Sequence, residues 1–209
     1  KVIKEHSTIG VLVTTDGSVT DLPRENYVAA EERAVRELKG INKPFVILLN
    51  CKEPTSQSGL RAQLEERYEA PVVAMNVEKM GEEEIALLLQ KVLLEFPVTR
   101  IDVHMPKWLQ TFAEEEKAVA DLLNAVKAAS SKIVKLRDCF ALENLFDEGS
   151  DYINPESIQL DPGTGKTQIF IGAKPALFYR VLGETCGENI DGDLALMQYL
   201  KEVAGVKKA

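Results

Sequence analysis

The stretch KPFVILLN, at Lys43–Asn50, is an apolar run that begins after a lysine and a proline and ends at an asparagine. A strand that is apolar on both faces is typical of a parallel sheet covered by helices on both sides. Similar runs lie on either side of it in the sequence. We therefore expect four strands of one mainly parallel sheet, at Thr8–Thr14, Pro44–Leu49, Pro71–Met75 and Val98–Val103.

Helical patterns separate these strands. Apolar residues at helical spacing predict helices over Arg24–Lys39, Ser58–Tyr68 and Glu82–Leu94, and Gly40 follows the first of them. Alternating strands and helices indicate an α/β fold in which the helices cross over between parallel strands. In such sheets ligands bind outside the carboxyl ends of the strands, so the loops there are the place to look for a site.

The loop after the central run has the sequence Asn50-Cys51-Lys52-Glu53. GTPases of the P-loop class carry Asn-Lys-x-Asp at this place, where the aspartate pairs with the guanine ring and the lysine lies over the base. Here Cys51 fills the lysine position and Glu53 the aspartate position, so the guanine code is lost. The four residues are candidates for a nucleotide-base loop, and a plain strand-to-helix connection is the alternative.

Two further loops end strands of the same expected sheet. Thr15 and Asp16 precede Gly17 after the first strand, and Asn76 follows the third. The first loop is a candidate polar cluster near a nucleotide. The Asp-Gly pair favours the alternative, a simple turn.

The pattern changes after Trp108. We expect helices over Leu109–Ala128 and Lys132–Phe146, a hairpin of Ser157–Leu160 and Thr167–Ile171, and two last helices, Lys174–Gly183 and Asp191–Val203. The sequence thus predicts the C-terminal half of a nucleotide-binding domain over residues 1–104. A smaller α+β domain of helices and a β-hairpin follows over residues 105–209.

The segment Gly163-Thr164-Gly165-Lys166-Thr167 ends like a phosphate-binding loop. That loop requires Gly-x-x-x-x-Gly-Lys-Ser/Thr, and the position of the first glycine is held by Leu160. Asp161-Pro162-Gly163 is ordinary turn chemistry, and a strand follows where a helix would be needed. The segment is therefore interpreted as the turn of the hairpin.

Composition excludes several function classes. The net charge of −8 argues against a nucleic-acid partner, and no apolar stretch is long enough for a membrane span. Three widely spaced cysteines and two histidines predict neither a disulfide framework nor a metal site, and they favour a reducing, cytoplasmic compartment. No cysteine has a histidine close by in sequence, so we identify no catalytic residue in the chain.

Several segments together resemble the stage IV sporulation protein A family. The resemblance covers essentially the whole chain and is most specific in its first 108 residues. It is carried by HSTIGVLVTTDGS (His6–Ser18), PRENYVAAEERAVRELK (Pro23–Lys39), KPFVILLN (Lys43–Asn50) and LEFPVTRIDVHMPKW (Leu94–Trp108), and more weakly by KIVKLRD (Lys132–Asp138) and LMQYLKEVAG (Leu196–Gly205).

The resemblance implies an ATPase of the P-loop GTPase superclass that shapes the spore coat of endospore-forming bacteria. Such a protein hydrolyses ATP with Mg²⁺ and polymerises in the mother-cell cytoplasm, on the outer forespore surface, as the base layer of the coat. The implied partners are further copies of itself, a small amphipathic peptide of the forespore membrane and coat morphogenetic proteins. The alternative is a non-enzymatic scaffold module with a degenerate nucleotide-binding fold.

The resemblance also implies that this chain is an internal fragment. The family's phosphate-binding loop and magnesium-binding region would precede residue 1, and a C-terminal domain would follow residue 209. We therefore expect no ATP or Mg²⁺ to bind to the fragment by itself. For the polymer contacts, the candidates are the charged helix Leu109–Ala128 and the hairpin Ser157–Ile171.

Overall fold

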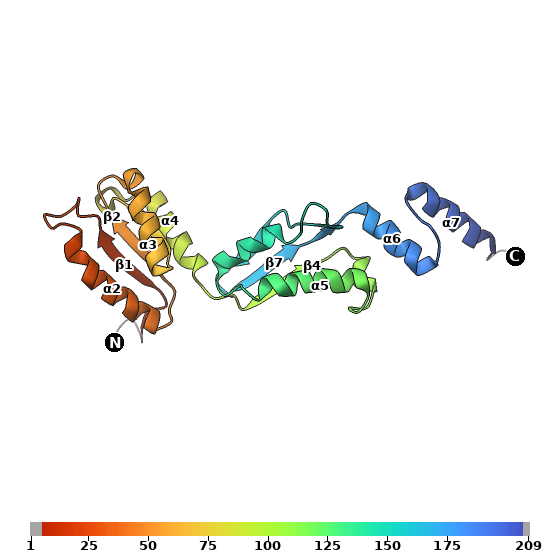
Figure 1. Cartoon of the computed structure of the whole chain (residues 1–209), viewed down its shortest axis with the longest axis horizontal. Helices are drawn as coiled ribbons and strands as arrows, with labels where there is room; N and C mark the ends of the chain where they lie inside the picture. The colour runs from red at the N-terminus through yellow and green to blue at the C-terminus, as the bar shows by residue number, and fades with distance from the viewer. Residues whose placement is uncertain (1–5, 207–209) are drawn as a thin grey trace. The chain divides into compact units, whose positions relative to one another are not determined.

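The computed structural model describes residues 6–206 and divides the chain into two compact units, Lys1–Pro97 and Val98–Ala209 (Figure 1). The sequence placed this boundary after residue 104. The difference arises from one strand, described below, that hydrogen-bonds within the second unit.

The first unit contains a three-stranded parallel sheet. Its strands are β1 (Gly10–Thr15), β2 (Phe45–Asn50) and β3 (Val72–Met75), in the order β1-β2-β3. Gly10 lies opposite Phe45, and Ile47 lies opposite Val72. The parallel pairing of the first three expected strands is confirmed, because the helices between them return the chain to the same end of the sheet.

Helices cover the sheet on both faces. Helices α2 (Glu25–Gly40) and α3 (Ser58–Tyr68) pack against one face, and α4 (Glu82–Leu94) packs against the other through Leu88. The short 3₁₀ turns η1 (Pro54–Gln57) and η2 (Val77–Lys79) follow β2 and β3. The buried face of α2 and α3 consists of Val35, Leu38, Leu64 and Tyr68, packed on Phe45, Ile47, Leu49 and Val72.

The fourth expected strand does not belong to this sheet. Strand β4 (Arg100–His104) pairs in parallel with β7 (Lys166–Phe170) of the second unit. Its side chains are half-buried or exposed, whereas the apolar side chains of β2 are all buried. Asp102 interrupts the apolar run in β4. A strand with this pattern suits a sheet with a solvated face, so the prediction of a four-stranded first sheet was wrong.

The second unit is an α+β arrangement. Its three-stranded sheet has the order β4-β7-β6, in which β6 (Ile158–Asp161) and β7 form the predicted antiparallel hairpin. A second pair joins β5 (Tyr152–Ile153) to β8 (Gly172–Ala173). The α-helices of the unit are α5 (Lys117–Ser130), α6 (Pro175–Cys186) and α7 (Asp193–Val206).

Two expected helices are shorter than the sequence indicated. In place of Leu109–Ala128, a 3₁₀ turn η3 (Leu109–Thr111) is followed by α5, which begins only at Lys117. The acidic run Glu114–Glu116 thus lies ahead of α5, where negative charge is favourable. In place of Lys132–Phe146, the structure has the 3₁₀ segment η4 (Leu136–Asn144), whose start is fixed by Asp138 accepting from two backbone N–H groups.

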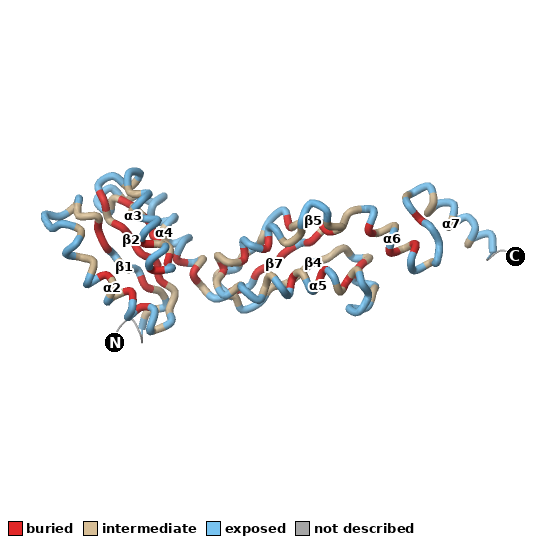
Figure 2. The backbone as a smooth tube through the Cα atoms, viewed as in Figure 1, coloured by how far each residue is buried: buried red, intermediate tan, exposed pale blue. Residues whose placement is uncertain are grey.

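The core of the second unit lies between its sheet and α5, η4 and α6. In Figure 2 the buried residues of β7 continue into this core, while α7 is mostly exposed. None of the helices in residues 6–206 combines the length and apolar character that a bilayer crossing requires. The buried members are Leu109, Val119, Leu122, Val126, Cys139, Leu142, Tyr152, Ile169, Ile171, Leu177 and Val181.

Candidate functional site

The loops at the carboxyl ends of β1, β2 and β3 are hydrogen-bonded to one another. The backbone N–H of Lys52 donates to the Ser18 hydroxyl at 2.9 Å, which ties the second loop to the first. The N–H of Val77 donates to Asn50 Oδ1 at 3.1 Å, and Asn76 Nδ2 donates to the Lys52 carbonyl at 3.3 Å. The structure therefore brings together the strand-end residues that the sequence singled out in three separate loops.

The loop after β1 is a turn stabilised by its own side chains. Asp16 Oδ1 accepts from the Ser18 N–H at 2.8 Å and from the Ser18 hydroxyl at 2.6 Å. Thr15 Oγ1 accepts from the Gly17 N–H at 3.0 Å, and Gly17 has a φ of +90°, which favours glycine. Thr15 is buried and Asp16 is half-buried. The expected turn chemistry is present, and it holds Ser18 where Lys52 can reach it.

The loop after β2 separates a buried residue from two exposed ones. Cys51 has no exposed surface, and its Sγ lies 3.6 Å from the Leu49 carbonyl oxygen. Burial, and then the charge of Asp16, raise the pKa of the Cys51 thiol above its usual value. Lys52 and Glu53 are exposed. Of the four candidate residues of this loop, Cys51 is thus closed off from a ligand, while Lys52 and Glu53 face solvent.

Asn76 is the polar residue that ends β3. Its Oδ1 accepts from the Glu78 N–H at 3.1 Å, which starts the turn η2, while its amide group donates to the second loop. Asn76 therefore holds the third loop against the second. Its position makes it a structural part of the loop cluster.

A buried carboxylate lies below the end of β1, and the sequence analysis missed it. Glu31 of α2 is only 4% exposed. Its carboxylate accepts hydrogen bonds from the Thr14 hydroxyl, from Arg24 Nη2 at 2.7 Å and from the Tyr68 hydroxyl at 2.7 Å. Arg24 Nη1 also donates to Thr14 Oγ1 at 3.1 Å. The four side chains join the end of β1, the residue that precedes α2, the middle of α2 and the last turn of α3.

The charge state of Glu31 follows from these contacts. Burial by itself would raise its pKa, but the hydrogen bonds from Arg24, Thr14 and Tyr68 outweigh burial and lower the pKa below its ordinary value. Burial and the bond to Glu31 raise the pKa of Tyr68 to about 12. One signal of this network is present in the sequence: Glu31 falls in the same helical stripe as Val28, Val35 and Leu38.

The described residues do not form a metal site. Among residues 6–206, no group of three or more His, Cys, Asp or Glu side chains converges on a common point. The exposed side chains of Lys52 and Glu53 can instead offer hydrogen bonds or charge to an organic ligand above the loop cluster. This edge of the sheet is suited to binding and positioning, and it contains no nucleophile paired with a base.

The segment Gly163–Thr167 contains the end of a hairpin turn, as expected, and the first two residues of β7. Asp161 accepts from the Gly163 N–H at 3.0 Å through its side chain and from the Gly165 N–H at 2.8 Å through its carbonyl. Gly165 has a φ of +69°, and Lys166 begins β7 directly after the turn. The backbone N–H groups of Gly163 and Gly165 are thus already paired with Asp161 and do not form a phosphate cradle.

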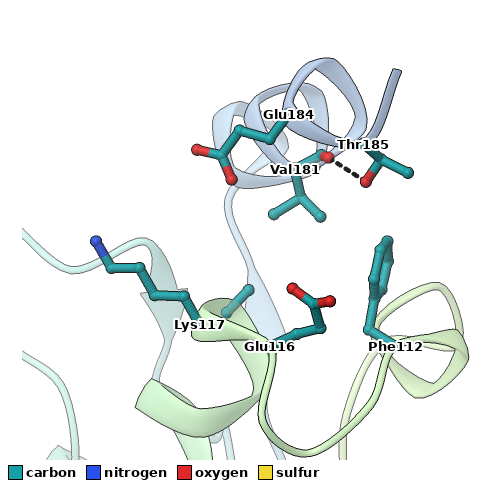
Figure 3. Close-up of a pocket in the computed structure, with 7 residues that line it drawn as sticks. Phe112, Glu116, Lys117, Val181, Glu184 and Thr185 are labelled. Carbon is teal, nitrogen blue, oxygen red and sulfur yellow. Dashed lines mark hydrogen bonds between the residues drawn. The ribbon is translucent and has the colours of Figure 1, made fainter. Parts of the chain in front are cut away.

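The second unit has a hollow of about 370 Å³ between the start of α5 and α6 (Figure 3). Glu116 and Lys117 line it from the α5 side, and Val181 and Glu184 line it from α6. The Thr185 hydroxyl donates a hydrogen bond to the Val181 carbonyl oxygen at 2.7 Å. No sequence pattern predicted this hollow. Its charged groups are exposed and of mixed sign, so its chemistry favours no particular ligand.

Two family models match the chain, and they divide it where the structure does. Residues 1–97 match the model described as "Stage IV sporulation protein A, ATPase domain", and residues 98–209 match the one described as "Stage IV sporulation protein A, middle domain". No solved structure is significantly similar to the chain.

Curated relatives carry the same description. A protein of Clostridioides difficile (strain 630) named stage IV sporulation protein A is 39% identical over 210 residues, which is 99% of this chain and 43% of the relative. Proteins of that name from Bacillus subtilis (strain 168) and Bacillus anthracis are 34% and 35% identical, again over 99% of this chain and 42% of each relative. The chain therefore spans less than half the length of these relatives.

Proposed function

The chain belongs to the stage IV sporulation protein A family, and we propose that it is part of an ATP-hydrolysing protein that polymerises on the outer forespore surface as the base layer of the spore coat. One observation carries the proposal. The residues that match an ATPase-domain model fold as a parallel sheet, and the loops at its carboxyl ends form one hydrogen-bonded cluster. This is the edge at which open α/β sheets bind nucleotides.

We assign this cluster to the base end of the nucleotide. Lys52 and Glu53 are exposed above it, and Asn50 and Asn76 hold the loop in place. Glu53 and Cys51 replace the residues that would read guanine, which is consistent with the use of adenine. Lys52 and Glu53 thus orient the base, Asn50 and Asn76 position the loop that carries them, and Cys51 acts only through packing.

The phosphate end of the nucleotide belongs to the remainder of the protein. Phosphoryl transfer needs a glycine-rich backbone cradle, a lysine and Mg²⁺ to neutralise the charge that develops on the phosphoryl group. The residues described here do not fit a magnesium site, and the hairpin at Gly163–Thr167 is no cradle. We place the Mg²⁺ ligands outside residues 6–206, and we assign no catalytic residue to this described part of the chain.

The family also suggests the setting. The proposed partners are other copies of the protein, a small amphipathic peptide on the forespore membrane and the coat morphogenetic proteins. The proposed location is the mother-cell cytoplasm at the forespore surface.

A scaffold without enzyme activity is the second candidate, and one observation favours it. The polar groups of the strand-end loops largely satisfy one another: Asn50 Oδ1, Asn76 Oδ1 and the Ser18 hydroxyl all accept from backbone N–H groups. A degenerate nucleotide fold would retain such a cluster for stability alone.

Phosphate release by the full-length protein separates the two candidates. We expect the protein to hydrolyse ATP and not GTP. With Mg²⁺ present, the rate of ATP hydrolysis should be at least about 10-fold higher than without it. We also expect sedimentable polymer to form with ATP and not with ADP. Polymer formation that is the same with and without any nucleotide, in a protein that releases no phosphate, would favour the scaffold.

A further inference from the structure

Helix α7 is held against α6 along one side only. The Tyr179 hydroxyl of α6 donates a hydrogen bond to the Asp193 carboxylate at the start of α7. The Tyr199 hydroxyl lies next to Cys186, at the end of α6. These contacts fix which side of α6 faces α7.

The other side of α7 is an exposed apolar stripe. Leu194 is 75% exposed, Met197 53% and Leu200 49%. Leu194, Met197 and Lys201 share one face because they are spaced i, i+3 and i+7, and Leu200 borders that face. We refer to these four residues as the α7 stripe. No residue of α7 is buried, and a helix of 14 residues with so little packing is only marginally stable in water. The stripe therefore requires a partner.

The hollow between the start of α5 and α6 opens on the opposite side of α6. Val181 and Glu184 line it, whereas Tyr179 and Cys186 contact α7. At about 100° per residue, these two pairs point in opposite directions from the helix. The loop after α6 passes over Gly183, where a Cβ would meet a backbone carbonyl oxygen at 2.6 Å. Because α7 is held on the far side of α6, it does not reach the hollow of its own chain.

The hollow matches the α7 stripe in chemistry. Phe112 and Val181 give it apolar surface, and Figure 3 shows Phe112 and Glu116 pointing from the α5 side toward α6. With the carboxylates of Glu116 and Glu184 and the single amine of Lys117, the hollow has a net negative charge. Among residues 6–206, neither of these carboxylates forms an ion pair.

Lysine 201 of the α7 stripe supplies the complementary charge. Lys201 is exposed, and it forms no ion pair with any side chain that the structure describes. An apolar stripe with one positive charge fits an apolar hollow with an excess of negative charge. A protein surface can match such a mixture of groups, which a small ion cannot.

We propose that the α7 stripe of one copy docks into the α5–α6 hollow of a second copy. The leucine and methionine side chains of the stripe cover the apolar part of the hollow, and the Lys201 amine pairs with Glu116 and Glu184. Each copy carries the stripe and the hollow on opposite sides of α6, so the contact repeats head to tail, as in open polymers. The inference rests on the polymerisation named in the proposed function and assigns one repeating contact to it.

Charge reversal in the full-length protein tests the contact. Lys201→Glu places a carboxylate opposite Glu116 and Glu184, and the double variant Glu116→Lys with Glu184→Lys places two amines opposite Lys201. We expect each variant by itself to form about 10-fold less sedimentable polymer with ATP than the unsubstituted protein, because like charges meet. An equimolar mixture of the two variants should restore assembly, because alternating copies then pair opposite charges at every contact.

The controls reverse exposed charges of the same unit away from both surfaces. Lys132→Glu and Glu143→Lys should assemble like the unsubstituted protein, singly and mixed. Lys201→Gln removes the charge without reversing it and guards against a folding defect. It should raise the protein concentration needed for assembly about 3-fold.

Four results overturn the inference. They are full assembly of the charge-reversed variants, failure of the mixture to restore assembly, an unchanged assembly threshold for Lys201→Gln, and restoration only when all three reversals are in one chain. The last result would place the contact within a single copy.

Phosphate release, measured on the same samples, separates this inference from the proposed function. Charge-dependent assembly without phosphate release keeps the contact and removes ATP hydrolysis. Polymer that forms equally well in every variant, with ATP hydrolysis intact, keeps the proposed function and removes the contact. Hydrolysis by an unsubstituted protein that does not sediment at any concentration removes both the contact and the polymer.

Discussion

The hydroxyl of Tyr68, at the end of α3, donates a 2.7 Å hydrogen bond to the carboxylate of Glu31 in the middle of α2. Both residues are buried, at 5% and 4% exposure. The bond joins the two helices that cover one face of the sheet, directly below the loop that ends β1. The packing of this face therefore depends on a charged group that is fully hydrogen-bonded.

Removing the Glu31 carboxylate should destabilise the first unit. Glu31→Ala leaves Arg24 and Tyr68 without their buried acceptor, and we expect the free energy of unfolding of the first unit to fall by about 3 kcal/mol. Urea denaturation followed by circular dichroism measures this. Glu37→Ala is the control, since Glu37 makes only an exposed ion pair with Arg33, and it should cost less than about 0.5 kcal/mol. Equal losses for the two variants would contradict the assigned role of Glu31.

The stabilising effect of Glu31 should depend on pH. Its pKa is lowered in the folded state, so its contribution is present above its unfolded value and is lost as pH falls through the folded value. We expect the difference in unfolding free energy between the unsubstituted chain and Glu31→Gln to be constant near neutral pH and to shrink in acid. Denaturation curves from neutral pH down to about pH 3 measure it. A difference that grows in acid would mean that Glu31 is protonated in the fold.

The Tyr68 hydroxyl has the opposite dependence. Its pKa is raised to about 12 in the fold, so its contribution is complete below its unfolded value and is lost as pH rises toward the folded one. Relative to Tyr68→Phe, the unsubstituted chain should therefore lose stability between about pH 10 and pH 12. The difference between the ultraviolet titrations of the folded unsubstituted chain and of Tyr68→Phe checks the shift directly.

Glu53 should affect how tightly the full-length protein binds its nucleotide. Because Glu53 is exposed at the base end of the loop cluster, Glu53→Ala should raise the KM for ATP about 10-fold with little change in kcat. Glu66→Ala, on the exposed side of α3, should leave KM unchanged. A fall in kcat alone would place Glu53 near the reacting phosphates and contradict its assignment to the base.

The 209-residue chain by itself should neither hydrolyse ATP nor bind it more tightly than about 1 mM, which corresponds to about −4 kcal/mol. Most nucleotide affinity in this class of protein comes from the phosphate cradle and the metal ion. Isothermal titration calorimetry measures the affinity. Micromolar binding would mean that a complete site exists within these residues.

The substitution Lys166→Ala in the full-length protein should leave ATP hydrolysis intact, because Lys166 follows a hairpin turn and does not lie in a phosphate-binding loop. Phosphate release measures this, and loss of hydrolysis would contradict the interpretation of the segment as a hairpin.

The sequence predicted those parts of the fold that local patterns specify. The bounds of α4 were predicted without error, and the parallel pairing of β1, β2 and β3 follows from their continuous apolar runs. Strand β4 was assigned to the wrong sheet because its partner, β7, is distant in sequence. A run as short as Ile101–Val103 carries no information about which strand it will meet.

The sequence predicted where the candidate site lies, but it did not predict the burial and hydrogen bonds of the individual side chains. Strand ends converge in any parallel sheet, so the meeting of the loops at Asp16, Asn50 and Asn76 was foreseeable. The burial of Cys51 was not, since it depends on how β2 and β3 end relative to each other. The hydrogen bonds of Glu31 depend on three elements at once, and only its place in an apolar stripe hinted at them.

The pairing of β4 with β7 affects the order in which the chain can fold while it is being synthesised. In the first unit, each strand pairs with the next one in the chain, so the sheet can grow as the polypeptide emerges. In the second unit, Arg100–His104 must wait until Lys166–Phe170 has been synthesised before its parallel partner exists. During that interval the nascent chain presents an unpaired strand and the apolar side of α5. We therefore expect the second unit to expose unpaired strand and apolar surface for longer during translation than the first unit does.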